Sequence, residues 1–111
     1  MKVISRSEFL KIEEKVLYSK FYKNHGEPTS SIEMKLGNCG ENDWVYQTLS
    51  GELAKGFYTC HEAWVSQFDS LDIDLDCAGR DGFYETEDEC RFLIFEKKDV
   101  IEIISKLNEF L

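Results

Sequence analysis

Three helix-start motifs divide the chain and constrain its fold more than any other feature. Residues 5–8, 59–62 and 99–102 each place a serine, threonine or aspartate oxygen three residues before a glutamate. Both ends of such a motif satisfy backbone N–H groups that the first helical turn leaves unpaired, so we predict a helix at each. The apolar residues that follow recur at helical spacing: Phe9 and Ile12; Cys60, Trp64 and Phe68; Val100, Ile103, Ile104, Leu107 and Phe110 or Leu111.

Strand-like runs fill the intervals between the predicted helices. Residues 16–22 and 43–50 are rich in β-branched and aromatic side chains, and residues 90–95 are apolar on both faces, which indicates a central strand. Residues 31–37 and 71–76 alternate with the two-residue period of a half-buried strand. The alternation predicts an inward face of Ile32, Met34, Leu36, Leu71, Ile73 and Leu75 and an outward face of Glu33, Lys35, Asp72, Asp74 and Asp76.

The predicted element order is α-β-β-β-α-β-β-α, which indicates a single α+β domain over residues 1–111. Strands joined by short turns pair antiparallel, so we expect a five-stranded, mostly antiparallel sheet with two to three helices packed on it. The last helix, residues 99–110, should bury Ile103, Ile104 and Leu107 against the sheet. The chain starts without a secretory signal and no later run could span a bilayer. We therefore expect a soluble, cytoplasmic protein.

The four cysteines lie at residues 39, 60, 77 and 90, with no close pair of the kind that zinc sites use. An even count permits disulfides, but reducing compartments favour thiols. Cys77 and Cys90 bracket an acidic stretch and would approach each other if the strands on either side of it pair. The prediction is four free thiols and no cofactor.

The net charge of −9 is unevenly placed. Residues 1–35 hold seven Lys/Arg against five Asp/Glu, whereas residues 36–111 hold six against seventeen. The acidic part would be repelled by phosphate backbones, so nucleic acid is not expected as a partner. Charge of this kind suits a partner protein with a basic surface.

Residues 71–90, "LDIDLDCAGRDGFYETEDEC", concentrate acidic side chains around a single base, Arg80. One interpretation is an outer strand whose charged face discourages edge-to-edge aggregation. A cation site built from Asp74, Asp76, Asp81 and Glu85 is an alternative, although an EF-hand loop would fail at Ala78. Paired carboxylates for glycoside-type chemistry would need a cleft, which an exposed strand does not offer.

Arg80 admits two interpretations. It is held in an ion pair by one of the neighbouring acids, or its guanidinium projects and grips an anion or a partner carboxylate. Phe83 and Tyr84 follow and could stack on a planar ligand, bury in a partner surface, or fold back over the core. The chain has no nucleophile elbow, phosphate-binding loop, dinucleotide fingerprint or zinc-protease helix, so no catalytic residue is predicted.

The segments "ISRSEFL…LYSKF", "LDIDLD…GRDGFYE" and "FLIFEKKDVIEIISKL" resemble small uncharacterised accessory proteins encoded by tailed phages and prophages. The likeness spans both ends of the chain and carries no catalytic signature. It implies a protein that binds and neutralises something in an infected or lysogenic bacterial host. Two target classes follow from it: host proteins, including defence nucleases, and nucleotide second messengers of defence systems.

The leading hypothesis is therefore a non-enzymatic inhibitor of a host factor, plausibly a component of antiviral defence. Its acidic face would meet a basic surface through Asp72, Asp74, Asp76, Glu85, Glu87, Asp88 and Glu89. The alternative is a binding module, a sponge, that sequesters a cyclic nucleotide signal, with a pocket that two subunits of a homo-oligomer could share. In that case Arg80 would meet the phosphate, and the base would stack on Trp44, Trp64, Phe83 or Tyr84.

Overall fold

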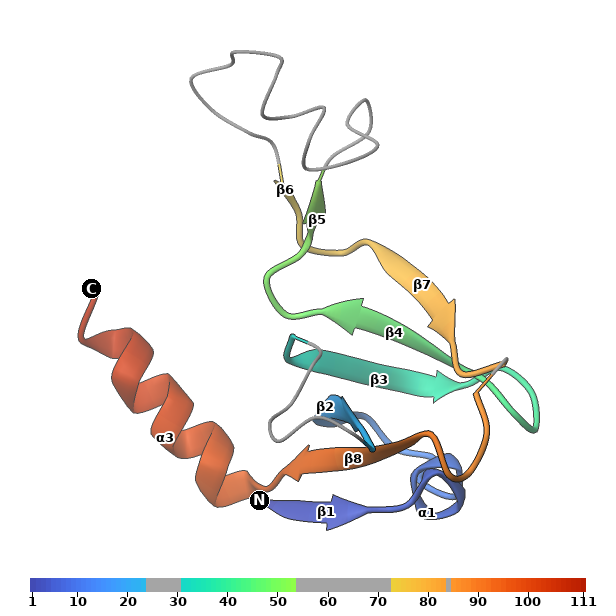
Figure 1. The fold of residues 1–111 in the computed structure, drawn as a ribbon. Helices are drawn as coiled ribbons and strands as arrows, with labels where there is room; N and C mark the ends of the chain where they lie inside the picture. The colour runs from blue at the N-terminus through green and yellow to red at the C-terminus, as the bar shows by residue number, and fades with distance from the viewer. Residues whose placement is uncertain (24–30, 54–72, 84) are drawn as a thin grey trace.

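A computed structural model describes residues 1–23, 31–53, 73–83 and 85–111 of the chain (Figure 1). The predicted helix at residues 59–68, together with Trp64, Leu71, Asp72, Cys60 and Tyr84, lies outside these residues. The helices and strands are β1 (Lys2–Ile4), α1 (Arg6–Leu10), β2 (Val16–Tyr22), β3 (Glu33–Asn38), β4 (Trp44–Thr48), β5 (Glu52–Leu53), β6 (Ile73–Asp74), β7 (Ala78–Asp81), β8 (Cys90–Phe95) and α3 (Lys97–Asn108).

The described residues form an α+β domain around an antiparallel sheet of six strands in the order β1-β8-β2-β3-β4-β7, and β5 and β6 pair as a separate ribbon. The α+β class is confirmed, and so is the central place of β8, which lies between β1 and β2. The predicted count of five strands is wrong. The sequence pattern missed β1, which has three residues, and β7, whose residues Ala78–Asp81 show no apolar alternation. Neither strand is long or apolar enough to display a period.

The structure describes residues 73–76 of the run at 71–76, and these four do not form the half-buried outer strand that the alternation predicted. Only Ile73 and Asp74 are in a strand, and that strand belongs to the small ribbon with β5. Ile73 and Leu75 are 47% and 62% exposed, so their predicted inward orientation is wrong. Within the described part of the chain, this two-stranded ribbon has no second layer against which these side chains could pack, which accounts for their exposure.

The inner and outer faces of β3 are the reverse of the prediction. Glu33 and Lys35 are buried, at 8% and 0% exposure, while the apolar residues between and beside them are only half-buried. The Tyr18 hydroxyl donates a hydrogen bond of 2.7 Å to Glu33 Oε2. Lys35 Nζ donates to the backbone oxygens of Phe9, at 2.8 Å, and Ile12. The buried lysine therefore has hydrogen-bond acceptors at the end of α1 and just beyond it, where carbonyls have free capacity to accept a bond.

The core is an aromatic cluster around Phe9, which α1 inserts over the inner face of the sheet. Phe9 stacks on Phe92 with ring centroids 4.1 Å apart, and it contacts Tyr18 at 4.7 Å and Trp44 at 4.9 Å. All four rings are fully buried. The predicted capping box at Ser5 and Glu8 is confirmed and fixes where α1 begins. Ile4, Cys90 and Ile94 complete the buried core.

The last helix begins earlier than predicted, and its apolar face is not packed on the sheet. Its N-cap is Glu96, with Asp99 as the third helical residue of the box, so the predicted Asp99–Glu102 box is wrong. Ile104 and Leu107 are 52% and 59% exposed, and only Ile103 is half-buried.

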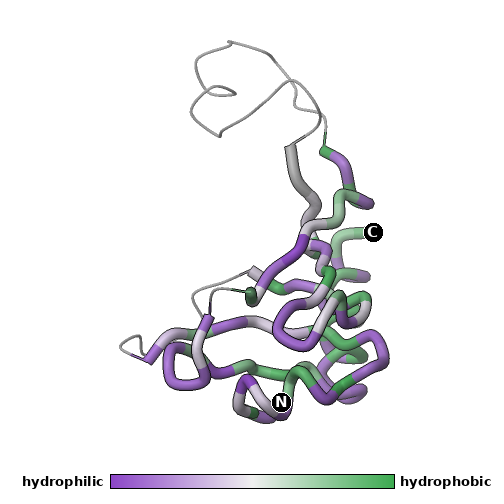
Figure 2. Tube along the Cα trace, turned by 90° about the vertical axis from the view of Figure 1, so that its right-hand side faces the viewer, coloured by the Kyte–Doolittle hydropathy of each residue, from purple (hydrophilic) through white to green (hydrophobic). Residues whose placement is uncertain are grey.

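Asp99 accounts for this geometry. It forms an ion pair of 2.7 Å with the Met1 amino group, which holds the first turn of the helix beside β1. From there α3 extends away from the sheet (Figure 1). Apolar and polar residues are interleaved along the chain (Figure 2). Within the described ranges, neither helix is long and apolar enough to cross a membrane.

Candidate functional site

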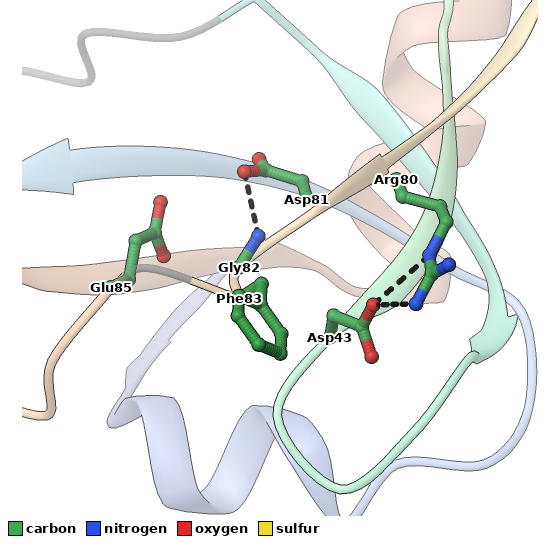
Figure 3. A pocket seen from close by; sticks show the side chains of 6 residues that line it. All are labelled: Asp43, Arg80, Asp81, Gly82, Phe83 and Glu85. Carbon is green, nitrogen blue, oxygen red and sulfur yellow. Dashed lines mark hydrogen bonds and ion pairs between the residues drawn. The ribbon is translucent and has the colours of Figure 1, made fainter.

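A pocket of about 380 Å³ opens at the edge strand β7 and the turn that follows it (Figure 3). Four of the residues named from the sequence line it, because they follow one another along β7 and its turn: Arg80, Asp81, Phe83 and Glu85. Gly82 and Asp43 complete the lining. Asp43 directly precedes β4, the strand that pairs with β7.

The turn at Gly82 shapes the pocket because the chain passes directly over the Trp44 ring there. Gly82 has φ of +96°, and a Cβ atom at this position would lie 2.1 Å from a ring carbon of Trp44. Only glycine accepts both that conformation and that approach. Arg6 from α1 holds the turn from below, since its Nη2 donates to the carbonyls of Gly82 and Asn42, each at 2.9 Å. Arg6 is 8% exposed.

The sequence reasoning missed Arg6. A basic residue in the first turn of a helix is unfavourable to the helix dipole, and that mismatch is the signal that could have drawn attention to it.

Arg80 forms an ion pair with Asp43. This acid lies outside residues 71–90, the stretch in which the sequence analysis expected the partner of Arg80. Its Nε donates to Asp43 Oδ2 at 3.0 Å, and its Nη2 contacts the same oxygen. The Asp43 carboxylate raises the pKa of the guanidinium. The Asp43 side chain is 6% exposed, whereas that of Arg80 is 65% exposed. One edge of the guanidinium therefore faces solvent while the other is committed to Asp43.

Asp81 and Glu85 converge on Lys20, a buried lysine of β2. Lys20 Nζ lies 2.7 Å from Asp81 Oδ2 and also contacts Glu85 Oε1. Burial lowers the pKa of Lys20, but its bonds to the two carboxylates outweigh this and leave the pKa above the ordinary value. Behind them, burial raises the pKa of the Cys90 thiol to about 12.

This arrangement bears on the cation site that the sequence suggested. Two of its four predicted ligands, Asp81 and Glu85, bind the ammonium group of Lys20 instead. The other two, Asp74 and Asp76, are exposed at the β5–β6 ribbon, where Asp74 Oδ1 accepts the backbone N–H of Asp76 at 2.9 Å. Among the residues that the structure describes, no three His, Cys, Asp or Glu side chains gather as metal ligands would.

The aromatic candidates separate into buried and exposed. Trp44 is fully buried, and its Nε1 donates to the Tyr18 hydroxyl at 2.9 Å. It therefore offers no exposed wall for a ligand, contrary to its predicted role. Phe83 is 63% exposed, and in Figure 3 its ring is seen between Glu85 and the Asp43–Arg80 pair. It is the aromatic side chain that the described part of the pocket presents to a ligand.

Further acidic side chains follow the pocket residues in the chain, and two of them, Asp88 and Glu89, line a separate hollow of about 250 Å³ with residues of β2 and β8. Glu87, Asp88 and Glu89 are exposed in the turn before β8. The hydrogen bond that Glu87 accepts from Ser7 lowers the pKa of its carboxyl group.

The chemistry of the pocket suits a cationic group beside an apolar one. Three carboxylates, an exposed aromatic ring and one partly committed guanidinium line a single hollow. A phosphate would lie against Asp43, Asp81 and Glu85, and repulsion from these groups opposes its binding. An arginine or lysine side chain would find carboxylate acceptors and a ring for its methylene groups.

Comparison of the chain with models of known protein families, with curated proteins and with solved structures finds no match.

Proposed function

We propose that this chain is a non-enzymatic accessory protein of a phage or prophage that binds and inhibits a protein of its bacterial host. The resemblance to phage accessory proteins supports this setting, and with it a place in the host cytoplasm and a target in antiviral defence. The surface that binds the host protein is the pocket at β7 with the acidic turn that follows it in the chain.

One observation carries the proposal: an exposed aromatic ring, Phe83, lies in a pocket lined by carboxylates, and the turn that follows in the chain carries further exposed acidic residues. Aromatic anchors seated in pockets dominate the energetics of protein interfaces, and surrounding charge speeds the encounter with a partner of opposite sign. The partner surface would therefore present a basic side chain next to an apolar one.

The test is capture of host protein from a lysate of the bacterial host, with the full chain as bait, at low and at high salt. Because the acidic residues act mainly through association rate, capture of the partner should fall as salt rises. The captured protein should lose its own activity when the purified chain is added. Recovery of no host protein at either salt concentration would reject the proposal.

A nucleotide sponge is the second candidate, because Arg80 and Phe83 line the same pocket. Its phosphate could reach the solvent-facing edge of Arg80, but it would also lie close to Asp43, Asp81 and Glu85, which counts against it. Melting curves with cyclic di- and trinucleotides decide between the candidates. A ligand at 100 times its dissociation constant adds about 2.7 kcal/mol of stability, and Arg80→Ala should abolish that gain. No shift with any of these nucleotides would eliminate the sponge and leave the inhibitor proposal untouched.

A further inference from the structure

Helix α3 carries an apolar stripe that is exposed along its whole length. Ile101, Ile104 and Leu107 are 57%, 52% and 59% exposed, and Phe110 and Leu111 continue the stripe at 87% and 101%. Spacings of three residues place Ile101, Ile104 and Leu107 on one side of the helix, and Phe110 and Leu111 follow just beyond its last residue, Asn108. A continuous patch of this kind marks an interaction site, because isolated soluble chains rarely expose several neighbouring large apolar side chains.

The charges of α3 are placed against its own dipole. Lys97 and Lys98 occupy the first turn, where the helix end is already positive, and Glu109 caps the end that is already negative. Asp99 and Lys106 are placed favourably, but Asp99 is committed to the Met1 amino group. An antiparallel helix of the same sequence would bring Lys97 and Lys98 beside Glu109 at both ends of the pair. The positive end of each helix dipole would also lie beside the negative end of the other.

We propose that α3 pairs with α3 of a second copy of this chain, antiparallel about a twofold axis near Ile104. In this pairing Ile104 meets its own counterpart, and Ile101 meets Leu107 of the second copy. A twofold interface requires such self-complementarity, and the spacing of 101, 104 and 107 supplies it because 104 is the midpoint. The basic first turn of each helix then lies against Glu109 of the other.

The area of the stripe fits a dimer of modest affinity. Five large apolar side chains exposed by half or more offer roughly 600 Å² per chain, against about 800 Å² per partner in a standard interface. The helix extends away from the sheet (Figure 1), and the exposure of its apolar side chains lets a second copy approach them. The dimer surface is separate from the pocket at β7, and this inference does not rest on the proposed function.

Sedimentation equilibrium of the full chain up to about 100 μM tests the proposal. The unmodified chain should dimerise, and Ile104→Glu should be monomeric because two carboxylates would meet at the axis. Ser105→Glu is the matched control, since it adds the same charge to an exposed neighbour outside the stripe, and it should still dimerise. At protein concentrations too low for dimers to form, both variants should keep the melting temperature of the unmodified chain, because dimerisation itself adds stability at higher concentrations.

Two charge reversals distinguish this pairing from others. Glu109→Lys, and separately Lys97→Glu with Lys98→Glu, each improve the match to the helix dipole, so each should leave the monomer at least as stable. Each should nevertheless weaken its own dimer at least threefold at low salt, and an equimolar mixture of the two variants should restore dimerisation.

Three results would overturn the proposal. The first is an unmodified chain that is monomeric at all concentrations. The second is a dimer that Glu109→Lys leaves unchanged, as a parallel pairing would. The third is an Ile104→Glu variant that is less stable than the unmodified chain at concentrations where both are monomers. The last result would mean that another segment of the same chain covers the stripe.

Discussion

Lys20 stabilises the inner wall of the pocket, and replacing it with methionine should lower the free energy of unfolding by about 2–3 kcal/mol. Removing one partner of a buried ion pair costs about 3–5 kcal/mol, because the other charge stays buried without compensation. Lys20 and Glu85 have side chains only 7% and 12% exposed, but Asp81 is 29% exposed and water can take over part of its solvation. The expected loss therefore lies at or below the lower end of that range.

Urea unfolding at pH 7 measures this loss. The folded-state pKa of Lys20 is above the unfolded one, so its contribution is fully present at this pH and is lost only as pH rises through the folded pKa. Lys15→Met is the control, since this lysine is exposed and should change stability by no more than about 0.5 kcal/mol. Combining Lys20→Met with Asp81→Asn and Glu85→Gln should restore part of the loss by removing the uncompensated charges. A loss below about 1 kcal/mol for Lys20→Met, the value of an exposed pair, would refute the reasoning.

Three further predictions concern buried groups elsewhere in the fold. Burial lowers the pKa of Lys35 to about 8, below its value in the unfolded chain. Between pH 8 and 10.5 the unfolded chain therefore binds a proton at Lys35 that the folded chain does not. The free energy of unfolding should rise by up to about 3 kcal/mol over this range. Lys35→Met should remove that rise in pH-dependent urea unfolding, and an unchanged pH profile would contradict it. In thermal unfolding, Gly82→Ala should lower stability more than Gly37→Ala, by about 2 kcal/mol or more. Both glycines have positive φ, but of the two only Gly82 lies against Trp44. Equal losses for the two variants would contradict this close approach. Thiol titration should find four thiols in the denatured, unreduced chain, and in the folded chain Cys39 and Cys77, which are exposed, should react before Cys90; two or fewer thiols would contradict the first claim.

Local sequence patterns predicted much of the fold because they report on single elements. The box at Ser5 and Glu8 and the apolar run of residues 90–95 each depend on neighbours within a few positions, and both are confirmed. The faces of β3 could not be read in this way. Glu33 and Lys35 are buried because Tyr18 and the end of α1 supply their hydrogen bonds, and those partners lie far from β3 in the sequence.

The candidate site was also predicted only in part: most of its lining residues were identified from the sequence, but their ion-pair partners were not. Arg80, Asp81, Phe83 and Glu85 were identified because they are close together in the sequence and in chemistry, and the structure places all four in one pocket. The groups that determine their charge state come from distant segments. Asp43 reaches Arg80 because β4 pairs with β7, and Lys20 reaches Asp81 and Glu85 across the inner face of the sheet. No local pattern could indicate these pairings, since sheet register sets them.

The most direct test of the central claim compares host-protein capture by three variants with that of the unmodified chain, by quantitative mass spectrometry at low salt. Phe83→Ala removes the aromatic anchor, and Asp88→Lys reverses a charge in the acidic turn that follows the pocket residues in the chain. Glu102→Lys makes the same charge change on α3. The account predicts that the first two variants lose at least tenfold of the captured partner, while Glu102→Lys retains it. Equal capture by all four proteins would contradict the claim that the pocket at β7 and its acidic turn form the binding surface.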